Sequence, residues 1–298
     1  MRECDLELSD GRRLHVYDTG ADGSEDCGPV VFWHHGTPNI GAPPEPLFPA
    51  AARLGVRWVS YDRPGYGGSP ARPGRTVASA AADTAAVADA LGIGRFAVMG
   101  HSGGGPHALA CAALLPERVL AVVDVAGLAP FGADGPDGSD GPDGLDGPDG
   151  LDWFAGMADC GVASLRAAVE GRAAKERYEA AAAYDPEMFT PDDHAALAGE
   201  WSWFGGIVGR ALAHGPGGLI DDDLSYVAPW GFDPTGITAP VLFLHGGRDR
   251  VAPCAHSRWL AGRCPSAELR VSPPDGHISV LGTGGAEALA WLVDRSRR

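Results

Sequence analysis

FAVMGHSGGGPHALA, residues 96–110, joins a short apolar run to a glycine-rich turn and the start of an alanine-rich segment. The run at residues 96–99 predicts a buried strand, and residues 106–115 predict a helix. Between them, Gly100-His101-Ser102-Gly103-Gly104 has the form Gly-x-Ser-x-Gly, in which small residues allow a tight strand-to-helix turn. Such a turn holds the serine hydroxyl exposed above the sheet, so Ser102 is the candidate nucleophile.

Similar apolar runs on both sides of this stretch predict further strands buried on both faces, as in a parallel sheet. They lie at residues 29–33, 57–61, 119–125 and 241–244. Helical stretches at residues 76–91 and 256–262 alternate with these strands, which predicts right-handed crossovers and a doubly wound sheet. At the start of the chain, two polar-apolar alternations flank Ser9-Asp10-Gly11 and predict an antiparallel hairpin.

The length of 298 residues suits one α/β core with an insertion. Residues 1–126 and 237–298 are predicted to form the α/β core, and the helical, aromatic-rich residues 127–236 are predicted to form a cap or lid inserted between them. Its aromatic side chains either contact a substrate or pack as the cap's own core, because aromatic residues dominate both kinds of site. The candidates for substrate contact are Trp153, Phe154, Trp203 and Phe204.

Within the predicted cap, residues 135–152 repeat Gly-X-Asp six times. These triplets hold too few apolar side chains to offset the entropy of ordering, so a solvated, flexible loop is expected. Calcium binding is the alternative, because regularly spaced carboxylates can supply oxygen ligands, but the D-x-[DN]-x-[DN]-G pattern is absent. No metal and no cofactor are expected.

Composition narrows the class of protein further. The chain is 45% hydrophobic and 21% charged, typical of a globular protein, and its net charge of −16 argues against nucleic-acid binding. No apolar run approaches the length of a membrane span, and no basic-then-apolar leader begins the chain.

The six cysteines contain no C-x-x-C pair, so reduced thiols and a cytoplasmic location are expected. The expected partner is a small-molecule substrate, without nucleic acid or membrane, and the oligomeric state is open.

A serine nucleophile needs a histidine base, which is itself oriented by a carboxylate. In chain order the acid and then the histidine follow the serine, and turns after predicted strands supply Asp249 and His277. Asp124, in the strand at residues 119–125, is an alternative acid. The other histidines of the turns, His34, His35, His101, His107 and His245, are expected to pack or hydrogen-bond around the site.

An oxyanion developing in the reaction needs two preorganised N–H donors. One is predicted to be the backbone of Gly103, directly after the nucleophile. The other is predicted to be the backbone of Thr37, because Gly36 permits a sharp turn and Pro38 has no N–H to offer. Beside the predicted catalytic groups, Pro38, Val251 and Ile278 are further candidates for substrate contact.

Together, several motifs resemble those of the α/β-hydrolase superfamily. They are HHGTP at 34–38, YDRPGYGGS at 61–69, GHSGGGPHALA at 100–110, HGGRDRVAP at 245–253 and DGH at 275–277. The resemblance spans both ends of the chain and leaves the predicted cap unmatched. It implies an eight-stranded, mostly parallel sheet with helices on both faces, a helical cap between the sixth and seventh strands, and the assignments of Ser102, Asp249 and His277.

Departures from related enzymes narrow the function that the resemblance implies. Haloalkane dehalogenases and epoxide hydrolases resemble this layout but use an aspartate nucleophile, so Ser102 argues against both. Prolyl iminopeptidases carry HGGPG and Ser-Trp-Gly where this chain has His35–Asn39 and Ser102-Gly103-Gly104, which argues against peptidase activity. Esterases, lactonases, carbon-carbon bond hydrolases and perhydrolases share an unaltered serine triad. The favoured function is hydrolysis of an ester or lactone of a small, largely apolar molecule through an acyl-enzyme. Carbon-carbon bond hydrolysis or another acyl transfer, perhydrolase-like or thioesterase-like, is the alternative, followed by a non-catalytic ligand receptor.

Overall fold

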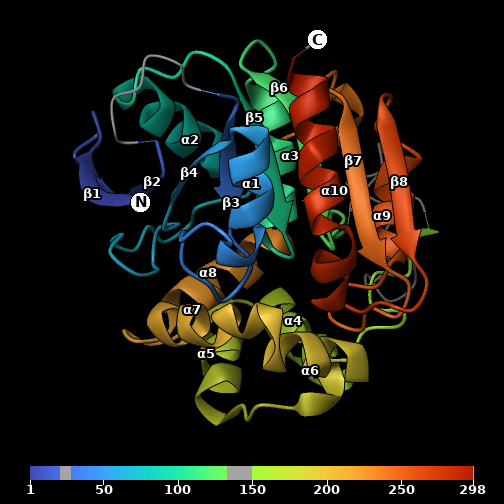
Figure 1. The fold of residues 1–298 in the computed structure, drawn as a ribbon. Coiled ribbons are helices and arrows are strands. Elements are labelled where there is room, and N and C mark those ends of the chain that lie inside the picture. Colours follow the sequence, from blue (N-terminus) through green and yellow to red (C-terminus); the bar gives the residue numbers. More distant parts are fainter. Residues whose placement is uncertain (21–27, 133–149, 298) are drawn as a thin grey trace.

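The computed structural model describes residues 1–20, 28–132 and 150–297, and its centre is an eight-stranded sheet (Figure 1). The strands are β1 (Arg2–Glu7), β2 (Arg13–Asp18), β3 (Val30–His34), β4 (Arg57–Tyr61), β5 (Phe96–His101), β6 (Val119–Val125), β7 (Val241–Gly246) and β8 (Ala267–Ser272). Their order across the sheet is β1-β2-β4-β3-β5-β6-β7-β8. β1 and β2 form the predicted antiparallel hairpin, β2 is antiparallel to β4, and the remaining pairs are parallel. The predicted mostly parallel sheet is confirmed.

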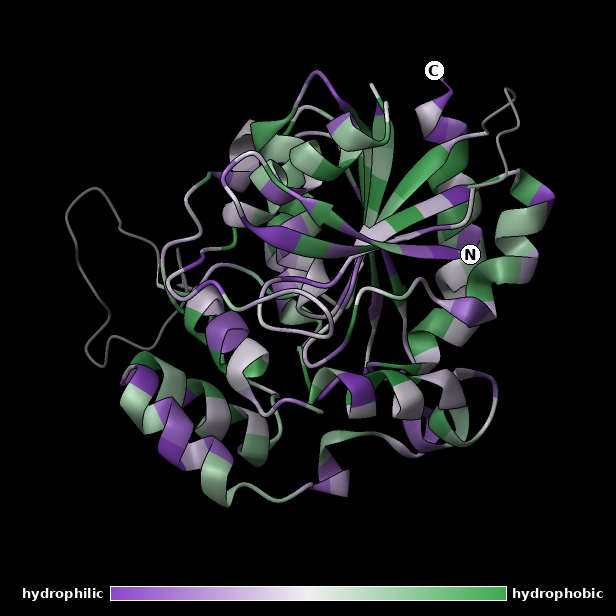
Figure 2. Ribbon diagram, turned by 90° about the vertical axis from the view of Figure 1, so that its left-hand side faces the viewer, coloured by the Kyte–Doolittle hydropathy of each residue, from purple (hydrophilic) through white to green (hydrophobic). Residues whose placement is uncertain are grey.

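Successive residues of the central strands point to opposite faces of the sheet. Phe32 of β3 packs into the cluster on one face, whereas Val31 and Trp33 of the same strand pack into the cluster on the other. Both faces are buried, which explains why these strands are nearly continuous apolar runs. Hydrophobic residues accordingly run along the central strands in Figure 2.

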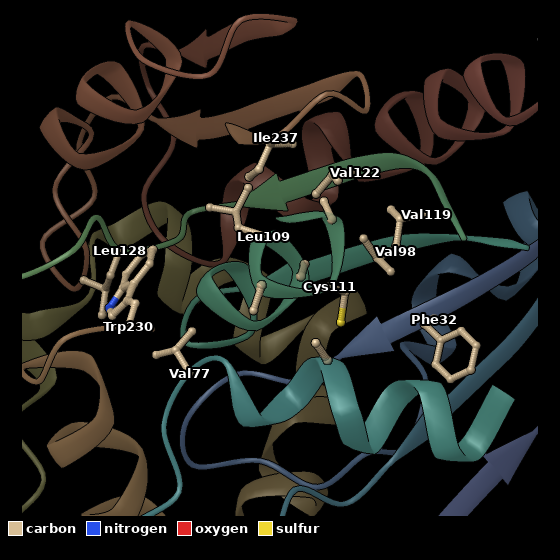
Figure 3. Packing of buried hydrophobic residues seen from close by; sticks show 14 of the residues in the cluster. Phe32, Val77, Val98, Leu109, Cys111, Val119, Val122, Leu128, Trp230 and Ile237 are labelled. Carbon is tan, nitrogen blue, oxygen red and sulfur yellow. The ribbon is translucent and has the colours of Figure 1, made fainter. Parts of the chain in front are cut away.

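Helices cover both faces of the sheet. On one face lie α2 (Ser79–Ala90), α3 (Gly104–Leu114) and α9 (Ala255–Ala261), and on the other α1 (Phe48–Leu54) and α10 (Ser279–Ser296). Figure 3 shows the first face, where Val98 of β5, Val122 of β6 and Leu109 of α3 enter one cluster. This packing fixes α3 directly behind the turn that contains Ser102.

The sequence patterns predicted most of these elements to within a few residues, but they gave no bounds for β8. Its sequence Ala-Glu-Leu-Arg-Val-Ser is only partly buried because the strand forms one edge of the sheet. An edge strand with half-exposed side chains lacks the continuous apolar run that marked the inner strands. The first helical turns also differ, since α2 begins at Ser79 and α3 already begins at Gly104.

Among its described residues, the chain between β6 and β7 contains five α-helices, and this part of the chain is here called the helical segment. They are α4 (Asp159–Val169), α5 (Arg172–Ala181), α6 (Pro191–Ala198), α7 (Trp203–Ala211) and α8 (Gly217–Tyr226). In Figure 1 the helical segment lies below the sheet, where the arrowheads of β7 and β8 point. The division into 1–126, 127–236 and 237–298 stays a prediction, and the predicted acidic loop lies outside the described residues up to position 149. Among the described helices, none has the length and apolar character needed to cross a membrane.

Candidate active site

Ser102 follows β5 in a turn so tight that the serine itself adopts a positive φ of 54°. A Cβ atom at Gly100 would lie 2.3 Å from the carbonyl oxygen of Gly104, and a Cβ at Gly104 would lie 1.9 Å from that of His34. Only glycine fits these two positions, as the motif predicts. The Ser102 N–H donates to the carbonyl of Val125 (2.8 Å), while its side chain stays partly exposed. A strained residue held by its surroundings is a common feature of catalytic sites.

Asp249 and His277 meet at the same edge of the sheet. Asp249 lies in the loop after β7, His277 lies between β8 and α10, and Nδ1 of His277 donates to Oδ2 of Asp249 at 2.7 Å. Both side chains are buried. Nε2 of His101, the residue before Ser102, donates to the backbone carbonyl of His277 at 3.1 Å. The loop that carries the predicted base is therefore bonded to the end of the strand that carries the predicted nucleophile.

The second oxygen of Asp249 is held by its own loop. Oδ1 accepts hydrogen bonds from the backbone N–H groups of Val251 (2.8 Å) and Ala252 (3.0 Å), and Nε2 of His245 lies 3.3 Å from Oδ2. Burial alone would raise the pKa of Asp249, but the imidazoles of His277 and His245 hold it below its ordinary value. Burial alone would lower the pKa of His277, whereas the Asp249 carboxylate raises it. The pair is thus arranged to stabilise an imidazolium.

Asp124, the alternative acid, lies elsewhere. Its side chain is fully buried in β6, and a Cβ at Gly105 or at Gly127 would lie 2.3 or 2.2 Å from its Oδ1. Burial raises the pKa of Asp124 to about 8, so the group is largely a neutral carboxylic acid at pH 7. Among the described residues, no hydrogen bond or ion pair joins Asp124 to His277.

Four of the other histidines, His34, His35, His101 and His107, are buried and neutral. Burial lowers the pKa of His34 and of His101 to about 3. It also lowers the pKa of His35 and His107 well below the ordinary value. Each of these rings bonds to a structural partner, as when Nδ1 of His107 donates to the carbonyl of Gly103 at 2.7 Å. A histidine with such a low pKa is a poor proton acceptor at neutral pH.

Thr37 and Gly103, the predicted oxyanion donors, are neighbours in space. A Cβ at Gly103 would lie 2.6 Å from Thr37 Oγ1, and a Cβ at Gly36 would lie 3.3 Å from the Ser102 Cβ. The loop after β3, residues 34–38, therefore lies against the nucleophile. Within the described parts of the chain, the backbone N–H groups of Thr37 and Gly103 make no hydrogen bond. Gly103 also immediately precedes α3, where the helix dipole favours negative charge.

A buried ionic network supports this loop from behind, and the sequence did not predict it. Asp222 of α8 is fully buried, at 2.7 Å from Nη2 of Arg63 and 2.6 Å from Nη1 of Arg75. The same Arg63 guanidinium donates to the backbone carbonyls of His35 and Gly36. Burial alone would raise the pKa of Asp222, but the two guanidinium groups hold it well below the ordinary value. Arg63 stands in the Tyr61–Ser69 motif that was noted, whereas nothing in the sequence marked Asp222.

Hydroxyl groups extend the network to the predicted oxyanion donors. Oγ1 of Thr37 donates to Asp222 Oδ2 at 2.5 Å and lies 2.8 Å from the hydroxyl of Tyr226, which also belongs to α8. The Tyr226 hydroxyl lies within 3.0 Å of the carbonyl oxygen of Gly103. Because Asp222 and Tyr226 are one helical turn apart, they reach the same site. The helical segment therefore contacts both residues whose N–H groups are predicted to bind an oxyanion.

The four aromatic candidates for substrate contact divide into two pairs. The indole of Trp153 donates to the carbonyl of Ala129 at 2.8 Å, and its ring packs edge-on against Phe154 at 5.1 Å. Trp153 is fully buried, and both residues belong to the hydrophobic cluster around α3, so they pack with the core of the sheet and not as a separate core of the cap. Phe204 of α7 is buried in the cluster on the other face, 5.6 Å from the ring of His101 and 5.0 Å from that of Trp203. Phe204 therefore lies next to the residue that precedes Ser102, and Trp203 is partly exposed.

The remaining candidates each belong to one of the three loops of the site. Pro38 lies in the loop after β3 and is partly exposed, as is Val251 in the loop of Asp249. Ile278 follows His277 and is buried. Among the described residues, no group of three or more histidine, cysteine, aspartate or glutamate side chains has an arrangement that could hold a metal ion.

Comparison with known proteins agrees with this geometry. Residues 29–137 match the family described as alpha/beta hydrolase fold. An epoxide hydrolase from Caballeronia sordidicola is 30% identical over 138 residues, which are 45% of this chain and 39% of that protein. The chain thus spans about two fifths of the length of this relative.

Two solved structures align over nearly the whole chain. The enol-lactonase from Burkholderia xenovorans LB400 has a TM-score of 0.69 at 21% identity, covering 99% of this chain and 100% of its own. An esterase from Exiguobacterium antarcticum has a TM-score of 0.66 at 21% identity, covering 98% and 100%. At this level of identity, the similarity shows that the fold is shared.

Proposed function

We propose that this chain, which has the α/β-hydrolase fold and matches that family over residues 29–137, is a serine hydrolase that cleaves an ester or lactone of a small, largely apolar molecule through an acyl-enzyme. The observation that carries the proposal is the hydrogen bond between the buried side chains of His277 and Asp249, in a loop that is bonded to His101, the residue before the partly exposed Ser102. A histidine held by a carboxylate is the base that activates a serine hydroxyl. The proposal also includes a cytoplasmic location, as the sequence predicted.

Acylation begins with attack of the Ser102 hydroxyl oxygen on the substrate carbonyl carbon, while Nε2 of His277 takes the hydroxyl proton. The carbonyl oxygen becomes an oxyanion, which accepts hydrogen bonds from the N–H groups of Thr37 and Gly103. The carbon-oxygen bond to the alcohol then breaks, and His277 returns the proton to the leaving oxygen. Asp249 stabilises the imidazolium during this exchange without taking the proton itself.

Deacylation repeats these steps with water. His277 takes a proton from the water as its oxygen attacks the acyl carbon, and the same two N–H groups stabilise the second oxyanion. The bond to Ser102 breaks, the serine oxygen recovers a proton from His277, and the carboxylic acid leaves. In a lactone, the alcohol and the acid belong to one molecule, so ring opening yields a hydroxy acid.

The relative named an epoxide hydrolase raises the question of epoxide opening. Epoxide hydrolases of this superfamily resemble the present layout but use an aspartate, whose carboxylate can attack the ring without losing a proton. This chain has Ser102 at the corresponding turn. A serine hydroxyl with a histidine base favours attack on a carbonyl carbon, so the proposal stays with an ester or lactone.

The apolar character of the proposed substrate rests on Phe204 and Trp203. The Phe204 ring lies 5.6 Å from that of His101, the residue next to the nucleophile, and the Trp203 ring packs edge-on against Phe204 at 5.0 Å. Aromatic side chains beside a reacting centre favour apolar groups of a ligand.

The direct test uses short p-nitrophenyl esters and a fluorophosphonate probe. The purified protein should hydrolyse the esters, and the fluorophosphonate should label Ser102, as read by peptide mass spectrometry. Both results follow from a histidine-activated hydroxyl beside two oxyanion donors. A folded protein that neither hydrolyses the esters nor reacts with the probe would contradict the proposal.

The pH profile of ester hydrolysis provides a second test. Catalysis requires neutral His277, and the Asp249 carboxylate raises the pKa of His277 above its ordinary value of about 6.5 despite burial. As the pH falls through this raised pKa, the imidazole becomes protonated and activity is lost. We expect kcat/KM, measured from pH 5 to 9, to have an acid limb with an apparent pKa above about 6.5. An acid limb clearly below that value would show that the pair does not stabilise the imidazolium.

A further inference from the structure

One carboxylate of the helical segment is bonded to the loop of His277. Asp193, in the first turn of α6, is buried and accepts five hydrogen bonds. Its Oδ1 accepts from the N–H groups of Ile278 and Ser279, both at 2.8 Å, and from the Ser279 hydroxyl at 3.0 Å. Its Oδ2 accepts from the N–H of His277 at 3.1 Å and from that of Thr190 at 3.0 Å.

These bonds connect two helices that are far apart in the sequence. Thr190 and Asp193 form a capping box at the start of α6. At the same time, Asp193 satisfies N–H groups at the start of α10, which have no acceptor within that helix. A carboxylate is especially favourable at this position because of the helix dipole. Asp193 thus caps two helices, and the second of them begins directly after His277.

The glycine before His277 makes this contact possible. A Cβ atom at Gly276 would lie 2.0 Å from Oδ2 of Asp193 and 2.7 Å from Oγ1 of Thr190. Any side chain there would push α6 away from the loop. The Asp-Gly-His sequence therefore serves the contact with Asp193 as well as supplying the histidine.

The charged and titratable groups around His277 come from four places. Asp249, from the loop after β7, bonds to its ring, and the His101 ring of β5 lies 4.9 Å away. Asp193 approaches from α6, and Asp275 stands two residues earlier on the same loop, bonded to Thr283. His101 is neutral because burial lowers its pKa to about 3. Asp249 and Asp193 are the two carboxylates whose charges raise the pKa of His277.

Asp193 keeps its negative charge at neutral pH. Burial alone would raise its pKa, but the N–H donors of Ser279, Thr190 and Ile278 hold it below the ordinary value. A permanent negative charge next to the His277 backbone favours a positive charge on that histidine. Asp193 therefore affects His277 in two ways. Its hydrogen bonds fix the backbone of the His277 loop, and its negative charge favours the imidazolium form.

We propose that Asp193 is a positioning residue for His277, fixing its loop for proton transfer and stabilising its cationic form. The inference rests on the proposed acyl-enzyme function, in which His277 becomes cationic in both half-reactions. Asp193 acts through His277 and does not itself contact the reacting atoms. A residue of the helical segment thereby contributes to the proton transfers at His277.

The test is the variant Asp193→Asn, which keeps the shape and removes the charge. The asparagine amide has only one acceptor oxygen, whereas the two carboxylate oxygens of Asp193 together accept five hydrogen bonds. We expect kcat on a p-nitrophenyl ester to fall by about tenfold or more, because small displacements of a base are costly. KM should stay within about twofold, and the acid limb should move to lower pH by about half a unit, since one nearby negative charge is lost. A change in KM alone would overturn the proposal.

Thr190→Ala is the matched control. The Thr190 hydroxyl accepts from the N–H of Asp193 at 3.1 Å, so its loss weakens the cap of α6 but leaves every bond from Asp193 to the His277 loop in place. We expect a lower melting temperature, with kcat and the acid limb unchanged. If Thr190→Ala moved the acid limb as far as Asp193→Asn does, a general loosening of α6 would explain both, and the positioning role would be wrong.

A measurement without turnover separates this inference from the proposed function. The pKa of His277 can be read by NMR of ¹³C-labelled histidine, with the resonance assigned by its loss in His277→Gln. It should fall in Asp193→Asn whether or not any ester is a substrate. An unchanged NMR pKa would overturn the inference, and absent ester turnover with a shifted NMR pKa would overturn the proposed function alone.

Should Asp193→Asn fail to fold, Ser279→Ala tests the positional effect by itself. The Ser279 hydroxyl donates to Asp193 Oδ1 at 3.0 Å and accepts from the N–H of Gly276 at 2.8 Å. Its removal loosens the loop and leaves the charge of Asp193 in place. We expect a several-fold lower kcat with an unmoved acid limb, and an unchanged kcat would contradict the positional effect.

Discussion

Ser102→Ala will lower ester turnover by about 10⁵-fold or more while the protein stays folded. The loss is large because the Ser102 oxygen forms the acyl-enzyme bond in the first half-reaction, and that bond breaks in the second. The fold should persist because alanine keeps the Cβ atom and the backbone bond from residue 102 to the carbonyl of Val125 (2.8 Å). Steady-state hydrolysis of a p-nitrophenyl ester measures the loss, and circular dichroism with thermal melting measures the fold.

An exposed serine provides the control for this variant. Ser266 precedes β8 and lies outside the three loops of the site. Ser266→Ala should keep full turnover and full labelling by the fluorophosphonate. If Ser102→Ala retained more than about 1% of the activity in a preparation shown to be free of contaminating esterase, a nucleophile other than Ser102 would attack the ester.

Asp249→Asn should lower kcat/KM by about 10⁴-fold, which is the effect of losing the correct histidine tautomer in a comparable triad. Oδ1 of Asp249 accepts two backbone N–H groups, from Val251 and Ala252. The amide oxygen of asparagine will keep those donors, so its NH₂ group will face Nδ1 of His277. That nitrogen must then accept a hydrogen bond, which puts the proton on Nε2 and prevents it from taking the proton of Ser102.

Asp124→Asn is the matched comparison, since it makes the same chemical change at another buried aspartate. Burial raises the pKa of Asp124 to about 8, so an amide replaces a carboxyl group that is already largely neutral at pH 7. We expect kcat/KM at pH 7 to change by less than about threefold. A larger loss from Asp124→Asn than from Asp249→Asn would assign the acid to β6.

The sequence predicted those parts of the fold and site that depend on neighbouring residues. The turn around Ser102 is local, because Gly100 and Gly104 are both within two residues of the serine. The inner strands are buried on both faces and therefore appear as apolar runs. Asp249 and His277 could be located because loops after parallel strands meet at one edge of the sheet. The edge strand β8, buried on one side only, had no such pattern.

Other parts of the site depend on contacts between distant residues. Asp222 reaches Thr37 across 185 positions, and Asp193 reaches the N–H of His277 across 84. An aspartate that will be buried against a guanidinium has the same local sequence as one that faces solvent, so neither could be singled out. The aromatic residues were ambiguous for a related reason. Only packing shows that Trp153 lies in the cluster on one face of the sheet and Phe204 in the cluster on the other, beside His101.

The anchoring of the helical segment affects how the substrate range of this protein can be altered. Two of its aspartates hold opposite halves of the site, Asp193 at the His277 loop and Asp222 at Arg63. A chimera that receives the whole segment from a relative lacking these carboxylates would bury Arg63 without its counter-ion, a change that typically costs about 3–5 kcal/mol. Laboratory evolution is therefore better directed at single positions such as Trp203, which is partly exposed and whose indole N–H makes no hydrogen bond among the described residues.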